Sequence, residues 1–510
     1  MQSRTAPVAA LLFASGFCAL VYQVGWLREF RLIFGASTAA SAAVLAIFIG
    51  GLGIGGLLLG PRADRHPRPL LLYATLETII AIFSALSPLL LTVARSIYLA
   101  SGGSSRLGVF AATLERLIMS VIVLAVPTVA MGGTLPAAAR AVTRAGDVRR
   151  QNLATLYALN TLGAVAGCLI ATFFLLELYG TRETLWLAAA VNLLVAVVAR
   201  TMDRRAGEAG GAGQARDDLA VPTHPACPAH PATPVLAAAP DLPDPLDPPD
   251  LLGPPDLLGP PDPRTLPDPP AALPVLPGRL FLLVAAATVG FAFFLMELVW
   301  YRLLGPLLGG SVFTFGLVLA VALAGIGIGG LLYSLVASDR PASLLGFASS
   351  CLIEAAAVAL TYALGDRVAL LALSFVPFGA TGFSAAVAGW TIVTVIVVLP
   401  PAIIAGYQFP LLIALFGRGR EGVGRDVGLA YAANTIGAII GSLAGGFGVL
   451  PWLTAPGAWR LVALVLVLLG LAAAILDVER KAREAREMRD WVCPCGVCGL
   501  CLDRRNVVTP

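Results

Sequence analysis

Long apolar segments recur along the whole chain and are separated by short stretches that carry most of the charged residues. Each segment approaches or exceeds the roughly 20 apolar residues that a helix needs to cross the hydrocarbon core of a bilayer. The pattern predicts an all-α polytopic membrane protein with about twelve transmembrane helices. We place these helices near residues 7–27, 35–59, 69–94, 108–138, 153–177, 182–199, 280–301, 310–336, 343–364, 380–414, 428–450 and 458–476.

The composition agrees with a membrane protein and argues against a nucleic-acid binder. The sequence is 58% hydrophobic and 13% charged, whereas soluble proteins contain about 25% charged residues. The formal net charge is only +4, and the basic residues are scattered over loops rather than gathered on one face. We therefore expect the lipid bilayer as a partner and no nucleic acid.

The sequence repeats itself with an offset of 274 residues. GLGIGG at 51–56 returns as GIGIGG at 325–330, and YALNTLGAVAG from Tyr157 returns as YAANTIGAIIG from Tyr431. Each copy contains six predicted spans, which is an even number. The two copies are therefore expected to be parallel repeats, related by an axis along the membrane normal.

The glycines of these two segments fit the pattern of a nucleotide-binding turn, which must lie between a strand and a helix of a soluble unit. Here the pattern lies inside unbroken apolar runs, where an exposed loop would leave backbone groups unpaired in lipid. We predict instead that the pairs Gly51 with Gly55 and Gly325 with Gly329 form flat faces at which two helices approach closely.

The chain divides into four predicted regions. Residues 222–277 contain 20 of the 37 prolines, and proline lacks the N–H that helix and sheet require. The regions are an N-terminal six-helix membrane repeat at 1–200, a Pro-rich disordered cytoplasmic linker at 201–278, a C-terminal six-helix membrane repeat at 279–477, and a charged cytoplasmic helix with a Cys-rich tail at 478–510.

The arginines predict the orientation in the membrane. They cluster after the second, fourth and sixth spans, at 62–68, 140–150 and 200–205, whereas the loops on the other side contain fewer, such as Arg106 and Arg182. Because basic loops stay in the cytoplasm, we expect a multi-pass protein of the bacterial inner membrane with both termini cytoplasmic.

One span contains an acidic residue where its repeat partner is neutral. Glu297 in FAFFLMELVWYR corresponds to Gln23 in CALVYQVGWLR. An ionisable side chain inside a span usually faces a cavity or a partner. Glu297 therefore either faces a central cavity, where it would bind a cation or exchange a proton, or pairs with Arg302 or a neighbouring helix.

Further polar residues lie inside apolar segments of both copies. Tyr157 with Asn160, and Tyr431 with Asn434, are three residues apart and share one helical face. They either form hydrogen bonds between helices or line a polar cavity at the interface of the repeats. Other candidates are Gln408 and Tyr407, expected to line a broken helix between Pro401 and Pro410, and the near-equivalent Glu77 and Glu354.

Four cysteines lie near the end of the sequence in WVCPCGVCGLC, at Cys493, Cys495, Cys498 and Cys501. Thiolates at such spacing can ligate zinc or an iron–sulfur cluster. The intervals do not match a standard zinc finger, so a free or redox-sensitive tail is the alternative. We assign no other cofactor.

Four motifs in this order resemble the membrane domain of the bacterial fused major-facilitator/spermidine synthase proteins: GFCALVYQVGWLREFRLIFGAST, GLGIGGLLLGPRADR, PTVAMGGTLPAAARAV and LYALNTLGAVAG. The resemblance covers most of 10–200 and 280–475 and implies a major-facilitator-like fold. Asp64 and Arg65 match the acidic and basic positions of a major-facilitator loop signature, of which the second copy keeps only Asp339 and Arg340.

In that family a soluble aminopropyltransferase domain commonly follows the membrane part. The residues after Leu476 offer neither its glycine-rich loop nor its set of aspartates, so we expect no enzyme activity and assign no catalytic residue. The leading hypothesis is transport or binding of a small metabolite, with a cationic, polyamine-related compound as the candidate. The alternative is a non-transporting membrane scaffold for a separately encoded soluble aminopropyltransferase.

Overall fold

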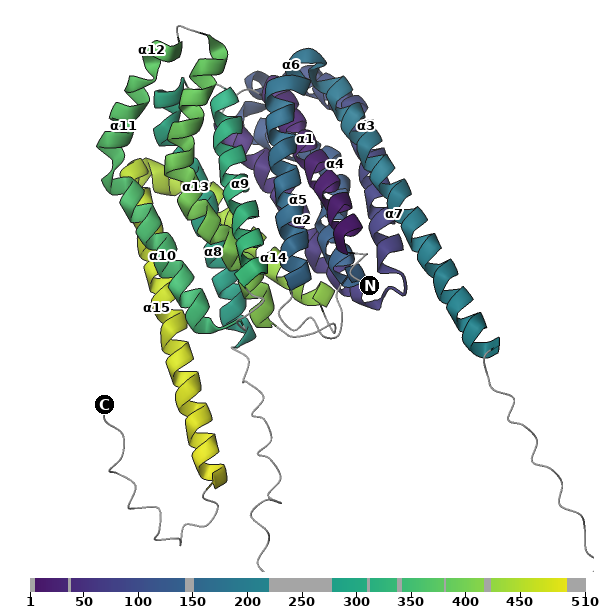
Figure 1. The fold of residues 1–510 in the computed structure, drawn as a ribbon. Helices are drawn as coiled ribbons and strands as arrows, with labels where there is room; N and C mark the ends of the chain where they lie inside the picture. The colour runs from purple at the N-terminus through teal and green to yellow at the C-terminus, as the bar shows by residue number, and fades with distance from the viewer. Residues whose placement is uncertain are drawn as a thin grey trace, which may run out of the picture. The chain divides into compact units, whose positions relative to one another are not determined.

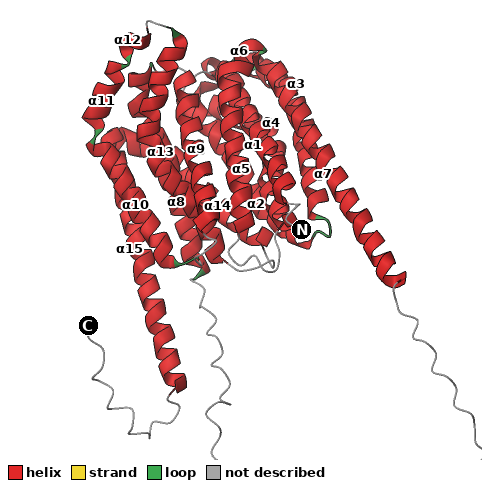
Figure 2. Ribbon diagram, viewed as in Figure 1, coloured by secondary structure: helices red, strands yellow, loops and turns green. Residues whose placement is uncertain are grey.

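The computed structural model, drawn as a ribbon in Figure 1, describes residues 5–34, 38–142, 151–219, 278–309, 312–336, 342–379, 382–416 and 423–492. Every regular element in these ranges is helical (Figure 2). Twelve of the helices within them are long and apolar enough to cross a membrane. The prediction of an all-α polytopic membrane protein with twelve spans is therefore confirmed.

The first copy of the repeat forms the first six spans. Its fifth span starts as a regular helix and continues through a π-helical turn into a short final helix. The elements are α1 (Thr5–Phe34), α2 (Thr38–Arg65), α3 (Pro69–Ala100), α4 (Gly103–Val142), α5 (Gln151–Ile170), η2 (Ala171–Leu175), α6 (Leu176–Leu178) and α7 (Gly180–Leu219).

The second copy forms the other six spans and adds two short helices, α11 and α12, before its fourth span. A π-helical turn, η4, again follows its fifth span. The elements are α8 (Arg279–Leu304), η3 (Gly305–Leu308), α9 (Val312–Val336), α10 (Leu344–Ala363), α11 (Gly365–Ser374), α12 (Val376–Gly379), α13 (Phe383–Phe416), α14 (Val423–Ala444), η4 (Gly445–Val449) and α15 (Leu450–Val492).

The chain separates into two compact units. One combines residues 1–205 with 275–510 and contains all twelve spans, and the other is 206–274. Within the second unit the structure describes the end of α7, up to Leu219. Most of the predicted linker, the four C-terminal cysteines and the pair Asp339 and Arg340 lie outside the described residues.

Several helices are longer than the spans predicted for them. The last span is predicted at 458–476, whereas α15 (Leu450–Val492) is interrupted by non-helical backbone at Thr454 and then continues as a helix to Val492. Its additional part is charged and contains an ion pair one turn apart, with Lys481 Nζ 2.8 Å from Asp477 Oδ2. An apolar-length criterion identifies only the part of a helix that suits hydrocarbon. The charged stretch from residue 478 onward is predicted separately as a helix, and in the structure it continues the last span to Val492.

The repeated glycines lie where helices touch, as predicted. A Cβ atom at Gly55 would overlap the carbonyl oxygen of Val129 on α4, and one at Gly329 would overlap that of Ile403 on α13. The four residues form two pairs related by the same offset of 274. The nucleotide-binding alternative is excluded for these segments because both are continuous helix.

The same stretch of α2 also contacts the second copy. Gly56 and Gly60 face α14, where added Cβ atoms would meet Gly428 and Gly424. The pseudo-symmetric contact joins α9 to α5, since Gly330 meets Tyr157 and Ala158. The two halves thus meet along α2 with α14 and along α5 with α9.

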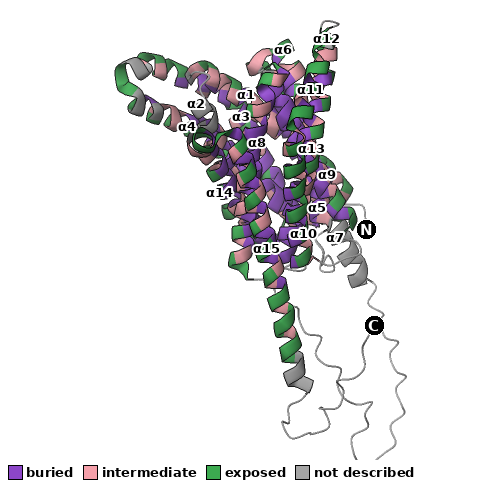
Figure 3. Ribbon diagram, turned by 90° about the vertical axis from the view of Figure 1, so that its left-hand side faces the viewer, coloured by how far each residue is buried: buried purple, intermediate pink, exposed green. Residues whose placement is uncertain are grey.

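The helices α3, α7, α10 and α15 present apolar side chains outward. Examples of these exposed residues are Ile82 on α3, Leu194 on α7, Ile353 on α10 and Leu468 on α15. Figure 3 shows buried residues where helices face one another and exposed residues along the outer sides of α10 and α15. An outer surface of this kind suits contact with lipid tails.

Candidate functional site

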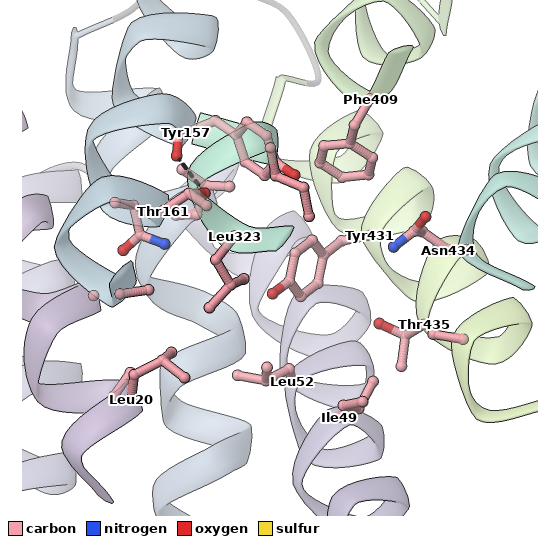
Figure 4. Close-up of a pocket in the computed structure, with 18 of the residues that line it drawn as sticks. Leu20, Ile49, Leu52, Tyr157, Thr161, Leu323, Phe409, Tyr431, Asn434 and Thr435 are labelled. Atoms are coloured by element: carbon pink, nitrogen blue, oxygen red, sulfur yellow. Dashed lines mark hydrogen bonds between the residues drawn. The ribbon is translucent and has the colours of Figure 1, made fainter. Parts of the chain in front are cut away.

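A cavity of about 230 Å³ lies between the two halves. Its wall comes from α1, α2, α4 and α5 of the first half and from α8, α9, α13 and α14 of the second, and Figure 4 shows several of the side chains around it. The polar or charged side chains in the wall are Ser15, Gln23, Thr134, Tyr157, Asn160, Thr161, Glu297, Tyr431, Asn434 and Thr435.

Glu297 contributes the one formally charged side chain of this wall. It lies on α8 with 6% of its surface exposed. No basic residue lines the cavity, and within the described part of the chain no hydrogen bond or ion pair holds the Glu297 carboxylate. The alternative pairing with Arg302 is not observed, because Arg302 is exposed near the end of α8. The carboxylate is thus available to a ligand.

Gln23 occupies the corresponding place on α1 and also lines the cavity. The two long polar side chains therefore face one cavity from opposite halves of the molecule. Since one is an acid and the other an amide, the wall is nearly symmetric in shape but asymmetric in charge.

The predicted pairs on α5 and α14 are in the wall as well. Tyr157 and Tyr431 both pack against Phe409, with ring centroids 5.0 Å and 6.0 Å from that of Phe409 (Figure 4). Among the described residues the side chains of Asn160 and Asn434 make no hydrogen bond to another helix. The cavity-wall alternative therefore describes their position, and their amides remain free for a ligand.

Asn160 and Asn434 also lie at two close backbone contacts. A Cβ atom at Gly16 on α1 would overlap the carbonyl oxygen of Asn160, and one at Gly290 on α8 would overlap that of Asn434. Because glycine allows the helices to approach here, each asparagine is presented beside the neighbouring span at the same depth in both halves.

Gln408 is not part of the cavity wall. It is fully buried, and its Nε2 donates to Oε2 of Glu354 on α10 at 2.7 Å. The expected broken helix is also wrong, because α13 is continuous through Pro401 and Pro410. Its neighbour Tyr407 packs against Tyr333, with ring centroids 5.3 Å apart. A hydrogen-bonding partner inside its own half explains where Gln408 points.

The aromatic residues Phe48, Phe293, Phe294 and Phe409 also line the cavity and were not predicted. Phe293 and Phe294 line the cavity on α8, four and three residues before Glu297. That spacing places them on the same helical face as the carboxylate, so the sequence FAFFLMELVW contained a signal for them.

The halves are held together at the face where α2 ends and α14 begins, which we call the terminal face. Both carboxylate oxygens of Asp64 accept backbone hydrogen bonds, from the N–H groups of Gly424 and Arg425, each at 2.8 Å. Arg140 Nε lies 3.7 Å from Asp64 Oδ1. A carboxylate at the start of α14 also interacts favourably with the positive end of that helix dipole. Asp64 therefore stabilises closure of the terminal face.

Replacing Asp64 by Ala should open this face. Hydrogen bonds to a charged group contribute about 1.5–3 kcal/mol each, so the ratio of closed to open molecules should fall at least about tenfold. Spin labels at Arg62→Cys and Arg425→Cys, in a background without other accessible cysteines, would report the distance across the face. The control is Asp203→Ala, which removes the ion pair with Arg68 inside the first half. An unchanged distance distribution in the Asp64 variant would show that this contact does not hold the halves.

Comparisons with known proteins agree with this architecture. The family model described as Major Facilitator Superfamily matches residues 5–402. A search of curated proteins gives no match.

Solved structures resemble the fold at low sequence identity. The proton:xylose symporter XylE bound to 6-bromo-6-deoxy-D-glucose is 12% identical, with 93% of this chain and 95% of that chain covered and a TM-score of 0.50. A bacterial homologue of the iron transporter ferroportin in an outward-facing state is 13% identical, with coverages of 93% and 99% and a TM-score of 0.50. The same homologue with soaked iron gives a TM-score of 0.51.

Proposed function

Because this chain belongs to the Major Facilitator Superfamily, a family of membrane transporters, we propose that it moves a small organic cation through the cavity between its halves. The observation that carries the proposal is the Glu297 carboxylate, which faces the cavity without a basic partner among the described residues. A fixed negative charge in a poorly solvated cavity attracts cations and repels anions.

The rest of the wall suits an organic cation better than a hydrated metal ion. Phe293, Phe294 and Tyr431 line the same cavity as the carboxylate, and aromatic rings stabilise ammonium groups by cation–π interactions. The amides of Gln23, Asn160 and Asn434 supply neutral donors and acceptors for the remainder of a ligand. The volume of about 230 Å³ is below the roughly 300–1,000 Å³ of sites for drug-sized molecules, which favours a small metabolite.

The orientation proposed from the arginines places the terminal face in the cytoplasm of a bacterium and the protein in its inner membrane. The contacts of Asp64 and the glycine contacts between α2 and α14 would then close the cavity toward the cytoplasm. In this proposal the substrate enters from the outside, and release requires those contacts to separate.

The resemblance to the fused synthase family suggests a polyamine as the cation and a chain without enzyme activity of its own. A separately encoded aminopropyltransferase as a soluble partner stays a prediction. The parts that would recruit it, most of the linker and the cysteine tail, lie outside the described residues. We favour transport because the family match and the cavity between the halves both support it.

Thermal unfolding of the detergent-purified chain tests the substrate class. Putrescine should raise the unfolding midpoint, by about 2.7 kcal/mol of stabilisation at a hundredfold excess over its dissociation constant. The uncharged analogue 1,4-butanediol and the dianion succinate should have no effect at the same concentration. Equal stabilisation by the diol, or stabilisation by succinate only, would contradict a cation site. If no amine of this size stabilises the protein, the organic-cation proposal fails.

A further inference from the structure

A second buried carboxyl lies inside the first half, behind the cavity wall. Glu77 on α3 is fully buried, and Asn192 on α7 donates from Nδ2 to its Oε2 at 2.7 Å and to its backbone oxygen at 2.9 Å. The other carboxyl oxygen, Oε1, makes no hydrogen bond of regular geometry among the described residues.

The surroundings of this carboxyl are rich in hydroxyl groups and, in the part of the chain that the structure describes, contain no cation. Ser15 and Tyr73 lie beside it, and Tyr22 and Ser84 form the next pair. Among the described residues the hydroxyls of Tyr22, Tyr73 and Ser84 are buried without a hydrogen bond of regular geometry, like Oε1 itself, although Tyr73 lies against Glu77 and Tyr22 against Ser84. So many buried oxygens without a regular hydrogen bond at one place are unusual, because buried polar groups are normally well hydrogen-bonded.

The titratable groups that face Glu77 are Cys18 and Tyr22 from α1 and Tyr73 from α3. From α7 it receives the neutral amide of Asn192, and none of the described charged residues of α2, α4 and α7 pairs with it. An ionised carboxylate at this place would be an uncompensated buried charge, which is costly. Binding one proton on Oε1 removes that charge and creates a donor for the adjacent hydroxyls.

Ser15 connects this carboxyl to the cavity. It lies beside Glu77 and also lines the cavity, one residue from the contact between Gly16 and Asn160. A hydroxyl in this position can accept a proton from a hydronium ion in the cavity while it donates its own to Oε1, so the net step transfers one proton from hydronium to Glu77 and leaves a water molecule in the cavity.

We propose that Glu77, with Ser15, Tyr73 and Asn192, forms a proton-binding site separate from Glu297 and joined to the cavity through the Ser15 hydroxyl. A change in its charge acts on the α1 wall from behind, at the level of Asn160. Exchange of this proton against a substrate cation rests on the proposed function, whereas the proton site itself does not.

Infrared spectroscopy of the purified full chain, titrated with acid and base, tests the site without a substrate. The wild type should show a carboxylic-acid C=O band that appears and disappears with pH, and Glu77→Gln should lose one such component. Gln keeps an oxygen that can accept from Asn192, so the fold should survive.

The matched control is Glu354→Gln, which changes a buried carboxyl in the other half whose partner, Gln408, does not line the cavity. It should retain the Glu77 component. Ser15→Ala should retain the component but slow its titration at least about tenfold, because the relay is removed, and Asn192→Ala should shift its frequency. The proposal would be overturned if Glu77→Gln kept the full set of titrating bands. It would also be overturned if neither Ser15→Ala nor Asn192→Ala changed the Glu77 component.

A second measurement distinguishes the proton site at Glu77 from the exchange of its proton against a substrate cation. Addition of putrescine to weakly buffered protein should release a proton in the wild type and in Glu354→Gln but not in Glu77→Gln. If the infrared component is present and putrescine releases no proton in any protein, the proton site stands and the cation exchange is rejected.

Discussion

Replacement of Glu297 by Gln is expected to weaken putrescine binding at least about 30-fold and to abolish its uptake into proteoliposomes. The change keeps the size of the side chain and removes the one formal charge of the cavity wall. Loss of one partner of a desolvated charge pair typically costs about 2–5 kcal/mol. The measurements are equilibrium binding to the purified protein and uptake by equal amounts of reconstituted protein.

The internal repeat offers a matched rescue for this variant. Gln23 faces the same cavity from the corresponding place on α1, so Glu297→Gln combined with Gln23→Glu moves the carboxylate to the other half without changing the net charge. The double variant should regain at least about a third of the lost binding free energy, since the distance from the cavity to either position is similar by symmetry. Unchanged uptake by the single variant would remove Glu297 from its proposed role, and a double variant as weak as the single would show that charge placement matters more than charge.

Substitution of Gly55 by Ala should destabilise the protein by about 1–3 kcal/mol, because overpacking at a filled contact forces the backbone to move. The new Cβ would overlap the carbonyl oxygen of Val129 on α4, and a carbonyl cannot rotate away as a side chain can. The loss exceeds the gain of about 1 kcal/mol that Ala usually brings to a helix. The measurement is the thermal unfolding midpoint in detergent.

Gly50 provides the control on the same helix. An added Cβ there would lie 3.5 Å from Cδ1 of Ile439, which is ordinary van der Waals contact. Gly50→Ala should therefore be neutral or slightly stabilising. Equal destabilisation by both substitutions would mean that the helix tolerates no Ala anywhere in this stretch, and that the contact with α4 is not the cause.

The spans and their duplication could be predicted from the sequence because lipid imposes a length and a polarity on every helix. The 274-residue offset then placed Tyr157 with Asn160 and Tyr431 with Asn434 on equivalent faces. Such residues meet at the interface of the halves, and all four line the cavity.

The rotation of individual helices was harder to predict. Gln408 and Thr134 are repeat equivalents, but Thr134 lines the cavity and Gln408 points to Glu354. A helix that is apolar on most sides gives no periodic signal for its orientation. The rotation of such a helix is then decided by the partner of its buried polar group. Partners such as Glu77 and Asn192 are 115 residues apart in the sequence, so the sequence does not reveal which residues pair.

The two π-helical turns at Ala171–Leu175 and Gly445–Val449 are separated by the same 274 residues as the rest of the repeat. A π turn spans one residue more than an α turn, so one insertion in a single six-helix ancestor accounts for both. Such an ancestor would have worked as a symmetric pair of identical subunits with two glutamines or two glutamates facing each other. The difference between Gln23 and Glu297 must have arisen after the gene was copied, which makes the charge asymmetry of the cavity younger than its architecture.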